Sequence, residues 1–233
     1  MHCSSLGAAQ APSVAGTAPE GTAPVIAIVG AGFSGSTLAA NLLLRQSLGP
    51  SHVILIERGA SFGRGIAYAR RDFPYLLNVP AGQMSADPSK PHDFLEFART
   101  VLPGAREDQF LPRALYGDYL EHRLRTAEQS RPAHVGFTKL RASVRDVTPA
   151  GRGRWRLQLD TGKSVVADHV VLACGNPPSL PIPGLADAVP PPVDPWHGPL
   201  HLDDCDSVLL VGTGLTMVDV ALRIAALERP ISI

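Results

Sequence analysis

The 233-residue sequence has few cysteines and no cluster of metal-binding residue types. Its three cysteines are odd in number, they lie far apart and none forms a C-x-x-C pair. This pattern argues against a disulfide framework and against a zinc site, and it suits a reduced, cytoplasmic setting. The eight histidines are scattered and include no H-E-x-x-H pattern, so we expect no metal centre.

A surplus of charge and a long apolar run are also missing. Lysine and arginine together number 21, as do aspartate and glutamate, and the formal net charge is zero. A general nucleic-acid binder needs a basic surplus to neutralise phosphates, so we expect no nucleic-acid partner. No apolar run reaches the roughly 18 residues that can cross a membrane, so we expect no membrane span. The sequence indicates neither a particular substrate nor an oligomeric state.

The first 23 residues lack the basic start and the continuous apolar core of a secretory signal. They are rich in alanine, glycine, serine, threonine and proline. Such a segment cannot bury enough apolar surface to offset the entropy of ordering, so we predict a disordered tail over residues 1–23. A start codon assigned too far upstream would also explain this composition.

A β-α-β unit is predicted directly after this tail. Residues 25–29 form a short, continuous apolar run rich in β-branched residues, which is typical of a buried parallel strand. A helix predicted over residues 36–46 follows, and residues 53–57 form a second apolar run of the same kind. This order of elements is the repeating unit of Rossmann-like sheets.

Beyond this unit the pattern indicates a long loop, two helices, an antiparallel meander, a buried strand, a proline-rich stretch and a second β-α-β unit. The long loop is predicted over residues 59–90, and the two helices over 91–102 and 113–128. The meander strands are predicted over 144–147, 155–159 and 164–167, and the buried strand over 169–175. The proline-rich stretch covers residues 176–199, and the second β-α-β unit covers 207–233. Ser89 is a candidate cap of the first of these helices. The predicted fold class is α/β, with a Rossmann-like, three-layer domain of parallel sheet and β-meander and the start of a second Rossmann-like unit.

The first turn carries the glycine fingerprint of dinucleotide-binding proteins, Gly30-x-Gly32-x-x-Gly35. In this pattern the first glycine permits a tight turn, the second lets a pyrophosphate approach the backbone, and the third lets the helix pack closely on the strand. Glu57 ends the second strand, where a carboxylate can accept hydrogen bonds from ribose hydroxyls. The alternative is a tight turn of a doubly wound fold that binds nothing.

A second glycine pattern, Gly212-x-Gly214, follows the run at residues 207–211 and precedes a predicted helix over 215–227. Met217 occupies the third small position and departs from the standard fingerprint. A second dinucleotide site and a plain structural turn both fit this pattern.

The order of these motifs resembles flavoproteins with two dinucleotide-binding domains, such as flavin-containing and N-hydroxylating monooxygenases and pyridine-nucleotide oxidoreductases. The chain more closely resembles a bacterial group of FAD/NAD(P)-binding proteins, in which a residue such as Met217 is not unusual. The segments that carry this resemblance are residues 62–68, 76–85 and 212–219. The resemblance covers residues 25–233 and implies FAD and NAD(P)H as cofactors.

The resemblance also implies which residues contact the cofactors. The ADP part of FAD would be held by Gly30, Gly32, Phe33, Ser34, Gly35 and Glu57. Arg64 would lie near a phosphate or ribose, and the loop from Asn78 to Ser85 would approach the flavin ring. Ala173, Cys174 and Gly175 match a strand-end motif, usually Ala-Thr-Gly, that touches the cofactor. The pyrophosphate of NAD(P)H would face Gly212, Gly214 and Thr216.

Several of these residues have a structural alternative. Arg64 could equally be a solvated or salt-bridged residue, and Cys174 a small packed side chain. Asn78 could order its own loop through backbone hydrogen bonds. Trp196 and His197 are predicted to pack and cap locally within the proline-rich stretch.

The resemblance implies an FAD-dependent, NAD(P)H-linked oxidoreductase of a monooxygenase-like kind, with an FAD-binding domain at 24–178, a linker at 179–206 and part of an NAD(P)-binding domain at 207–233. The alternatives are a non-catalytic nucleotide-binding module and an inactive gene fragment. No residue is a convincing acid, base or nucleophile, and we name no catalytic residue. Because the second unit stops inside its second strand, we expect a truncated chain that binds FAD weakly and turns over nothing.

Overall fold

The computed structural model describes residues 23–180, 182–185, 188, 191–197, 200–202, 205–227, 229 and 231–233. The disordered tail predicted for residues 1–23 therefore lies outside the described residues, except for Ala23. The strands are β1 Val25–Val29, β2 Ser51–Glu57, β3 Val135–Arg141, β4 Val144–Pro149, β5 Trp155–Leu159, β6 Ser164–Ala167 and β7 His169–Leu172. The helices are α1 Phe33–Leu44, the short 3₁₀ helix η1 Ala81–Gln83, α2 Asp93–Val101, α3 Arg113–Ser130 and α4 Leu215–Ala225.

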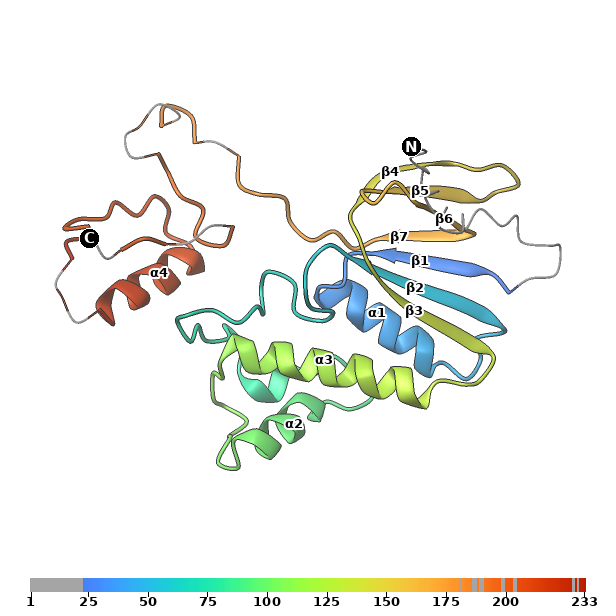
Figure 1. Ribbon diagram of the computed structural model, residues 1–233. Helices are drawn as coiled ribbons and strands as arrows, with labels where there is room; N and C mark the ends of the chain where they lie inside the picture. The colour runs from blue at the N-terminus through green and yellow to red at the C-terminus, as the bar shows by residue number, and fades with distance from the viewer. Residues whose placement is uncertain are drawn as a thin grey trace, which may run out of the picture.

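A parallel sheet in the order β3-β2-β1-β7 forms the middle of the first domain (Figure 1). Strand β1 is central, so that Val29 pairs with Ile56 of β2 on one side and with Leu172 of β7 on the other. The carboxyl ends of these strands therefore meet at one edge of the sheet, where ligands of open α/β folds bind.

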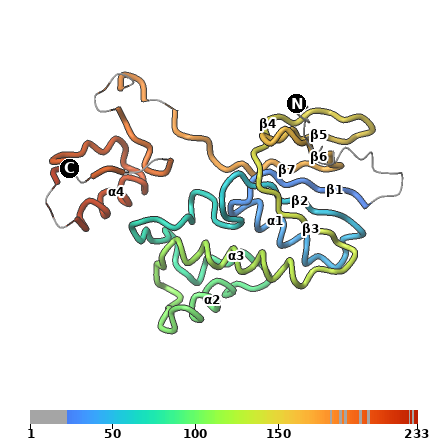
Figure 2. The backbone as a smooth tube through the Cα atoms, viewed as in Figure 1, coloured from blue at the N-terminus to red at the C-terminus, as the bar shows by residue number. Residues whose placement is uncertain are grey.

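Strand β1 alternates between two apolar cores, as a strand buried on both faces must. Ile28 packs with α1 and α3 on one face, in a core that also contains Ala39 and Leu124. Ala27 packs on the opposite face against β5 and β6, with Leu157. The β4-β5-β6 meander thus covers one face of the parallel sheet and α1 and α3 cover the other, which confirms the predicted three-layer α/β fold (Figures 1 and 2).

A further apolar core joins α2 to the first half of α3 and to the loop around η1. Phe94, Tyr116 and Tyr119 are its largest fully buried side chains. The inner face of α3 is apolar, because Leu115, Tyr119, Leu120 and Leu124 are all buried. Ser89 does not cap α2: its hydroxyl donates to the Asp87 carboxylate, and the helix begins after His92.

The sequence prediction missed one strand of the parallel sheet. Strand β3 pairs with β2 along its whole length, from Ser51 with Val135 to Glu57 with Arg141. Helix α1 also begins at Phe33 rather than at residue 36, because the fingerprint glycines belong to the turn and the first helical turn itself.

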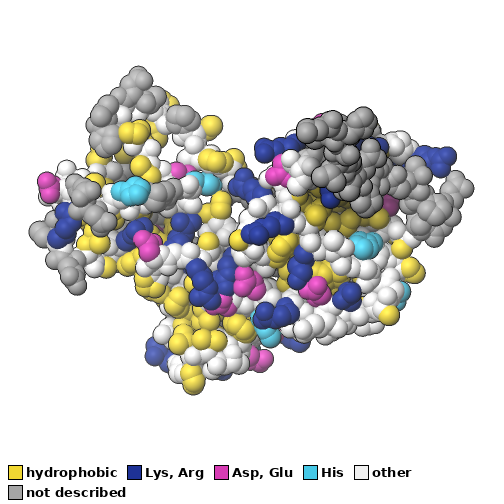
Figure 3. Space-filling view, in the orientation of Figure 1, with side chains coloured by type: hydrophobic (Ala, Val, Ile, Leu, Met, Phe, Trp, Pro, Cys, Tyr) yellow, Lys and Arg dark blue, Asp and Glu magenta, His cyan; other side chains and the backbone are white. Residues whose placement is uncertain are grey.

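The second unit is smaller than predicted. Helix α4 is present, but the runs at 207–211 and 231–233 meet in a single parallel bridge between Ser207 and Ser232. Val208 and Leu210 pack against Val220 and Ile224 of α4, whereas Leu209 is 83% exposed, so the described residues cover only one face of the expected strand. Figure 3 shows apolar side chains over this part of the molecule. None of the described helices is long and apolar enough to cross a membrane.

Candidate dinucleotide-binding site

The turn between β1 and α1 has the backbone geometry that the glycine fingerprint requires. Gly30 has a φ of +97°, and a Cβ there would overlap the carbonyl oxygen of Ala173. A Cβ on Gly35 would overlap the carbonyl of Gly30. These glycines are therefore needed by the fold itself, because the strand, the turn and the helix approach too closely for any side chain.

Gly32 differs from its neighbours because the protein leaves room beside it. Apart from its chain neighbours, the nearest atom to a Cβ on Gly32 would be the Cα of Gly65 at 3.5 Å, which is ordinary van der Waals contact. Packing within the described chain therefore does not explain a glycine at this position. Dinucleotide-binding turns require a glycine at such a position, because a Cβ would fill the space that a pyrophosphate needs.

The first turn of α1 offers backbone donors beside this space. Gly32 is the N-cap residue, and no side chain caps the helix. Ser34 is exposed, and the Ser36 hydroxyl donates to the Gly32 carbonyl at 2.7 Å rather than capping an N–H group. Unpaired N–H groups and the positive end of the helix dipole favour an anion at such a position.

Glu57 closes the site at the carboxyl end of β2. Its carboxylate accepts a hydrogen bond of 2.7 Å from the backbone N–H of Ala31 and another of 2.7 Å from that of Gly59. A carboxylate has about four lone-pair positions, so acceptor capacity remains for the ribose hydroxyls. Glu57 therefore also fixes the glycine turn to the end of β2.

Arg64 adopts the salt-bridged alternative. Its guanidinium donates to both carboxylate oxygens of Glu121, to the Asp118 carboxylate and to the Ala114 carbonyl, all on α3. Burial lowers the pKa of this guanidinium, but the hydrogen bonds to Glu121 and Asp118 outweigh that effect and raise the pKa. These bonds leave the guanidinium little capacity to donate a further hydrogen bond. A contact between Arg64 and the cofactor therefore stays a prediction.

The Arg64 contacts hold residues 62–68 against both α3 and the glycine turn. The N–H of Gly63 donates to the Ala31 carbonyl at 2.7 Å. Gly117 lets the arginine cross α3, because a Cβ on it would crowd the Arg64 guanidinium at 2.7 Å. The ion pairs thus position the loop that borders the open space beside Gly32.

Phe33 meets this loop through an aromatic group. Its ring centroid lies 6.4 Å from that of Tyr68 and 6.2 Å from that of Tyr116. Burial raises the pKa of both tyrosine hydroxyls, so both remain neutral at physiological pH. Phe33 is 41% exposed, so part of its surface remains accessible.

The end of β7 brings Cys174 beside the same turn. The Cα of Cys174 is 3.3 Å from the position that a Gly30 Cβ would take, and Gly175 has a φ of +71°. The Cys174 thiol is exposed, with its sulfur 3.9 Å from the Val29 carbonyl oxygen. Asn78 is exposed too, and its predicted approach to the flavin remains a prediction.

FAD is expected to protect Cys174 from alkylation, because the exposed thiol borders the predicted cofactor site. We expect saturating FAD to slow the reaction of Cys174 with iodoacetamide about fivefold or more, an effect of about 1 kcal/mol. Cys205, which is partly exposed outside this site, is the internal control. Peptide mass spectrometry measures both rates, and equal protection of the two thiols would contradict a contact at Cys174.

The second glycine motif lies apart from the first. Gly212 has a φ of +115° and Gly214 is the N-cap residue of α4; beyond their chain neighbours, no described atom lies within 4 Å of the Cβ position of either. Thr216 lies in the first turn of α4, where its hydroxyl accepts a 3.1 Å hydrogen bond from the Trp196 indole. The structure therefore gathers Gly212, Gly214 and Thr216 at one helix end, away from Gly30 and Gly32.

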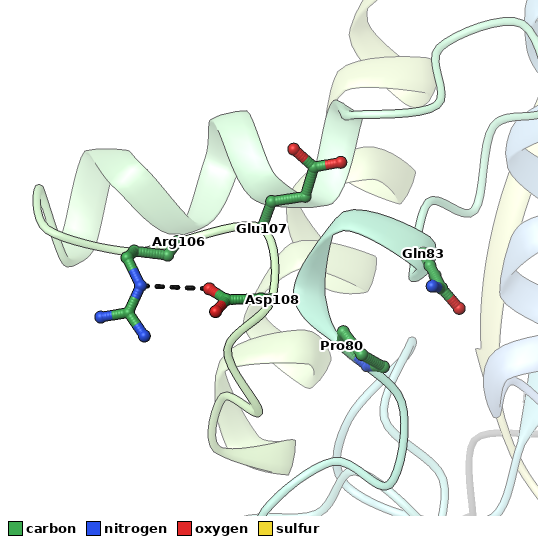
Figure 4. Close-up of a pocket in the computed structure, with 5 residues that line it drawn as sticks. All are labelled: Pro80, Gln83, Arg106, Glu107 and Asp108. Carbon is green, nitrogen blue, oxygen red and sulfur yellow. Dashed lines mark hydrogen bonds and ion pairs between the residues drawn. The ribbon is translucent and has the colours of Figure 1, made fainter.

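A pocket of about 510 Å³ lies elsewhere, between η1 and the loop before α3 (Figure 4). It is lined by Pro80, Gln83, Arg106, Glu107 and Asp108. An exposed ion pair of 3.1 Å joins Arg106 to Asp108 across its rim. Pro80 and Gln83 belong to the loop that was predicted to approach the flavin, but none of the residues predicted to hold the ADP part of FAD lines this pocket.

The fold and the turn together define a dinucleotide-binding protein of the Rossmann type. A family model described as FAD-NAD(P)-binding matches residues 27–177, more than half of the chain, so the chain belongs to this FAD/NAD(P)-binding family. The family confirms the predicted cofactor class of FAD and NAD(P). No curated protein matches the sequence.

Solved structures with a similar fold include flavin monooxygenases. An open crystal structure of cyclohexanone monooxygenase is 19% identical, with a TM-score of 0.45 over 69% of this chain and 29% of that one. The enzyme from Rhodococcus sp. Phi1 bound to NADP+ is 20% identical, with a TM-score of 0.45 over 69% and 28%. OTEMO in complex with FAD and NADP is 18% identical, with a TM-score of 0.43 over 70% and 28%. The chain thus spans less than a third of these structures.

Two features of the site were not identified from the sequence. Tyr116 of α3 lies beside the Phe33 ring. The only signal for it in the sequence was the spacing of Tyr116 and Tyr119, which suits one face of a helix. Trp196 was expected to act locally, yet its ring lies 5.3 Å from that of Tyr75. His197 does act locally, with Nδ1 at 3.0 Å from the Asp194 carboxylate.

Proposed function

We propose that this chain provides the FAD-binding part of an NAD(P)H-linked oxidoreductase of the monooxygenase-like kind. The observation that carries this proposal is the open space beside Gly32, bordered by the uncapped first turn of α1 and by the Glu57 carboxylate. These groups suit a pyrophosphate and a ribose, which are the polar parts of ADP. Bound FAD would accept a hydride from NAD(P)H and pass electrons to oxygen or another acceptor.

The chain's own residues have binding and positioning tasks in this proposal. Gly32 and the amides of the first turn would hold the phosphates, Glu57 the ribose, and Arg64 the neighbouring loop. Gly212, Gly214 and Thr216 would hold the pyrophosphate of NAD(P)H at the start of α4. We also propose domain boundaries of 24–178, 179–206 and 207–233 and a cytoplasmic setting, the latter suggested by the cysteine content of the sequence.

The visible absorption spectrum tests this function. The purified chain is mixed with FAD, freed of excess flavin and then given NADH or NADPH, first without oxygen and then under air. Flavin bands that bleach with one nucleotide and return in air would establish the oxidoreductase and its donor. Bound flavin that never bleaches would instead establish a non-catalytic binding module, and a folded chain that takes up no flavin would contradict the proposal.

A further inference from the structure

Trp196 lies at the contact between the proline-rich segment, the first domain and α4. Its ring packs edge-on against Tyr75, with centroids 5.3 Å apart. The guanidinium carbons of Arg71 and Arg113 lie 5.1 and 5.2 Å from the ring centroid. Its indole N–H donates to the Thr216 hydroxyl at 3.1 Å. One side chain thus contacts a loop of the first domain, the start of α3 and the first turn of α4.

Polar bonds fix the two sides of this contact. Arg113 donates through Nε to the Leu76 carbonyl and through its terminal nitrogen to Asp219 of α4, each at 2.8 Å. Arg113 and Asp219 are only 17% and 14% exposed, so this ion pair is largely shielded from water. Arg71 donates to the carbonyl of Trp196 itself at 3.0 Å. Arg71 and Arg113 of the first domain therefore fix the position of the Trp196 ring.

Asp194 sets the backbone that presents Trp196. Its carboxylate accepts from the backbone N–H of Trp196 at 2.8 Å and binds the His197 ring and Ser179 as well. These bonds, the one from the Trp196 backbone first, lower the pKa of Asp194. The turn that carries Trp196 is thus ordered by local bonds, while its ring is used for long-range contacts.

Helix α4 depends on such outside contacts. It has 11 residues, and an isolated helix of this length is marginal in water. The core beneath it contains only Leu202, Val220 and Ile224 as buried residues among those the structure describes. Trp196, Tyr75 and Arg113 also help to line a pocket of about 270 Å³.

We propose that Trp196 is a positioning residue that docks the start of α4 onto the FAD-binding domain. Arg71, Tyr75 and Arg113 hold one side of the indole, and Thr216 holds its N–H. Because the indole is a donor only, the Thr216 hydroxyl keeps its own proton for another acceptor. The acceptor for this proton would be a phosphate oxygen of NAD(P)H, and in this respect the inference rests on the proposed function. Trp196 would then fix the position of Thr216 relative to the first glycine turn.

Peptide-resolved hydrogen–deuterium exchange of the full chain tests the docking without any nucleotide. In Trp196→Ala we expect the amides of α4 to exchange about tenfold faster, because ring, cation–π and hydrogen-bond contacts are lost together. In Trp196→Phe, which keeps an aromatic ring but loses the indole N–H, we expect the amides of α4 to exchange about threefold faster. Thr216→Val should give the same increase, because it removes the same hydrogen bond. The double variant should therefore show no further increase. Trp155→Phe, on β5, is the control and should leave α4 unchanged.

The outcomes separate the two claims. Exchange of α4 within about twofold of wild type in Trp196→Ala would overturn the docking role. Equal acceleration in α1 and α4 of both Trp196 variants would also overturn it, since that would show general destabilisation. Adding NADPH to wild type then tests the second site: slower exchange at the start of α4 supports it, and no change refutes the nucleotide role of Thr216 while the docking result stands.

Discussion

Replacing Gly32 with valine is expected to leave the fold intact and to weaken FAD binding about tenfold to a hundredfold. The Cβ of the new residue meets only ordinary contact with Gly65, so the apo protein can accept it. The side chain then fills the space of the pyrophosphate, and overpacking of this kind costs about 1–3 kcal/mol. Titration of FAD followed by flavin fluorescence measures the affinity, and chemical unfolding measures the stability.

Gly30→Ala is the matched contrast, because its Cβ would overlap the Ala173 carbonyl and its φ is +97°. We expect the apo protein to lose about 2–5 kcal/mol of stability from strain and overlap together. If Gly30→Ala and Gly32→Val had the same effects on stability and on FAD affinity, the assignment of separate roles to the two glycines would be wrong.

Replacing Arg64 with methionine is expected to destabilise the protein by about 3 kcal/mol even without FAD. Breaking a buried ion pair costs about 3–5 kcal/mol, since it leaves charges without partners. The Arg64 side chain is 8% exposed, but the Asp118 and Glu121 side chains are 29% and 30% exposed, which places the loss at the low end. Urea unfolding followed by circular dichroism measures it.

Two variants control this result. Arg64→Lys keeps the charge but cannot bind Glu121 through paired nitrogens, so we expect a smaller loss. Arg106→Met removes an ion pair in which both side chains are at least 70% exposed, and it should change stability by less than about 0.5 kcal/mol. An Arg64→Met protein as stable as wild type, with FAD affinity alone reduced, would establish the cofactor contact instead of the structural role.

Much of the first domain could be predicted because its signals are local. The apolar runs of β1 and β2 are buried on both faces, and Gly30 and Gly35 between them lie where the backbone needs φ above zero or close packing. Strand β3 was missed because it is an edge strand. Its burial varies along Val135–Arg141, and exposed Thr138 and Lys139 interrupt the apolar pattern.

The roles of single polar side chains could not be predicted in the same way. Nothing near Arg64 in the sequence distinguishes a phosphate contact from an ion pair, because its partners Asp118 and Glu121 follow 54 and 57 residues later. Trp196 likewise pairs with Tyr75 across the fold. Local patterns predict strands, turns and helices, whereas the partners of long side chains depend on how those elements pack.

Competition between FAD and its fragments tests the central claim most directly, namely that the turn at Gly30–Gly35 binds the ADP half of FAD. FAD is titrated into the wild-type chain, and ADP or FMN is then added as a competitor. The account predicts saturable FAD binding that ADP displaces and FMN does not, with the affinity reduced in Gly32→Val. A folded chain that binds no FAD, or one from which FMN displaces FAD while ADP does not, would contradict it.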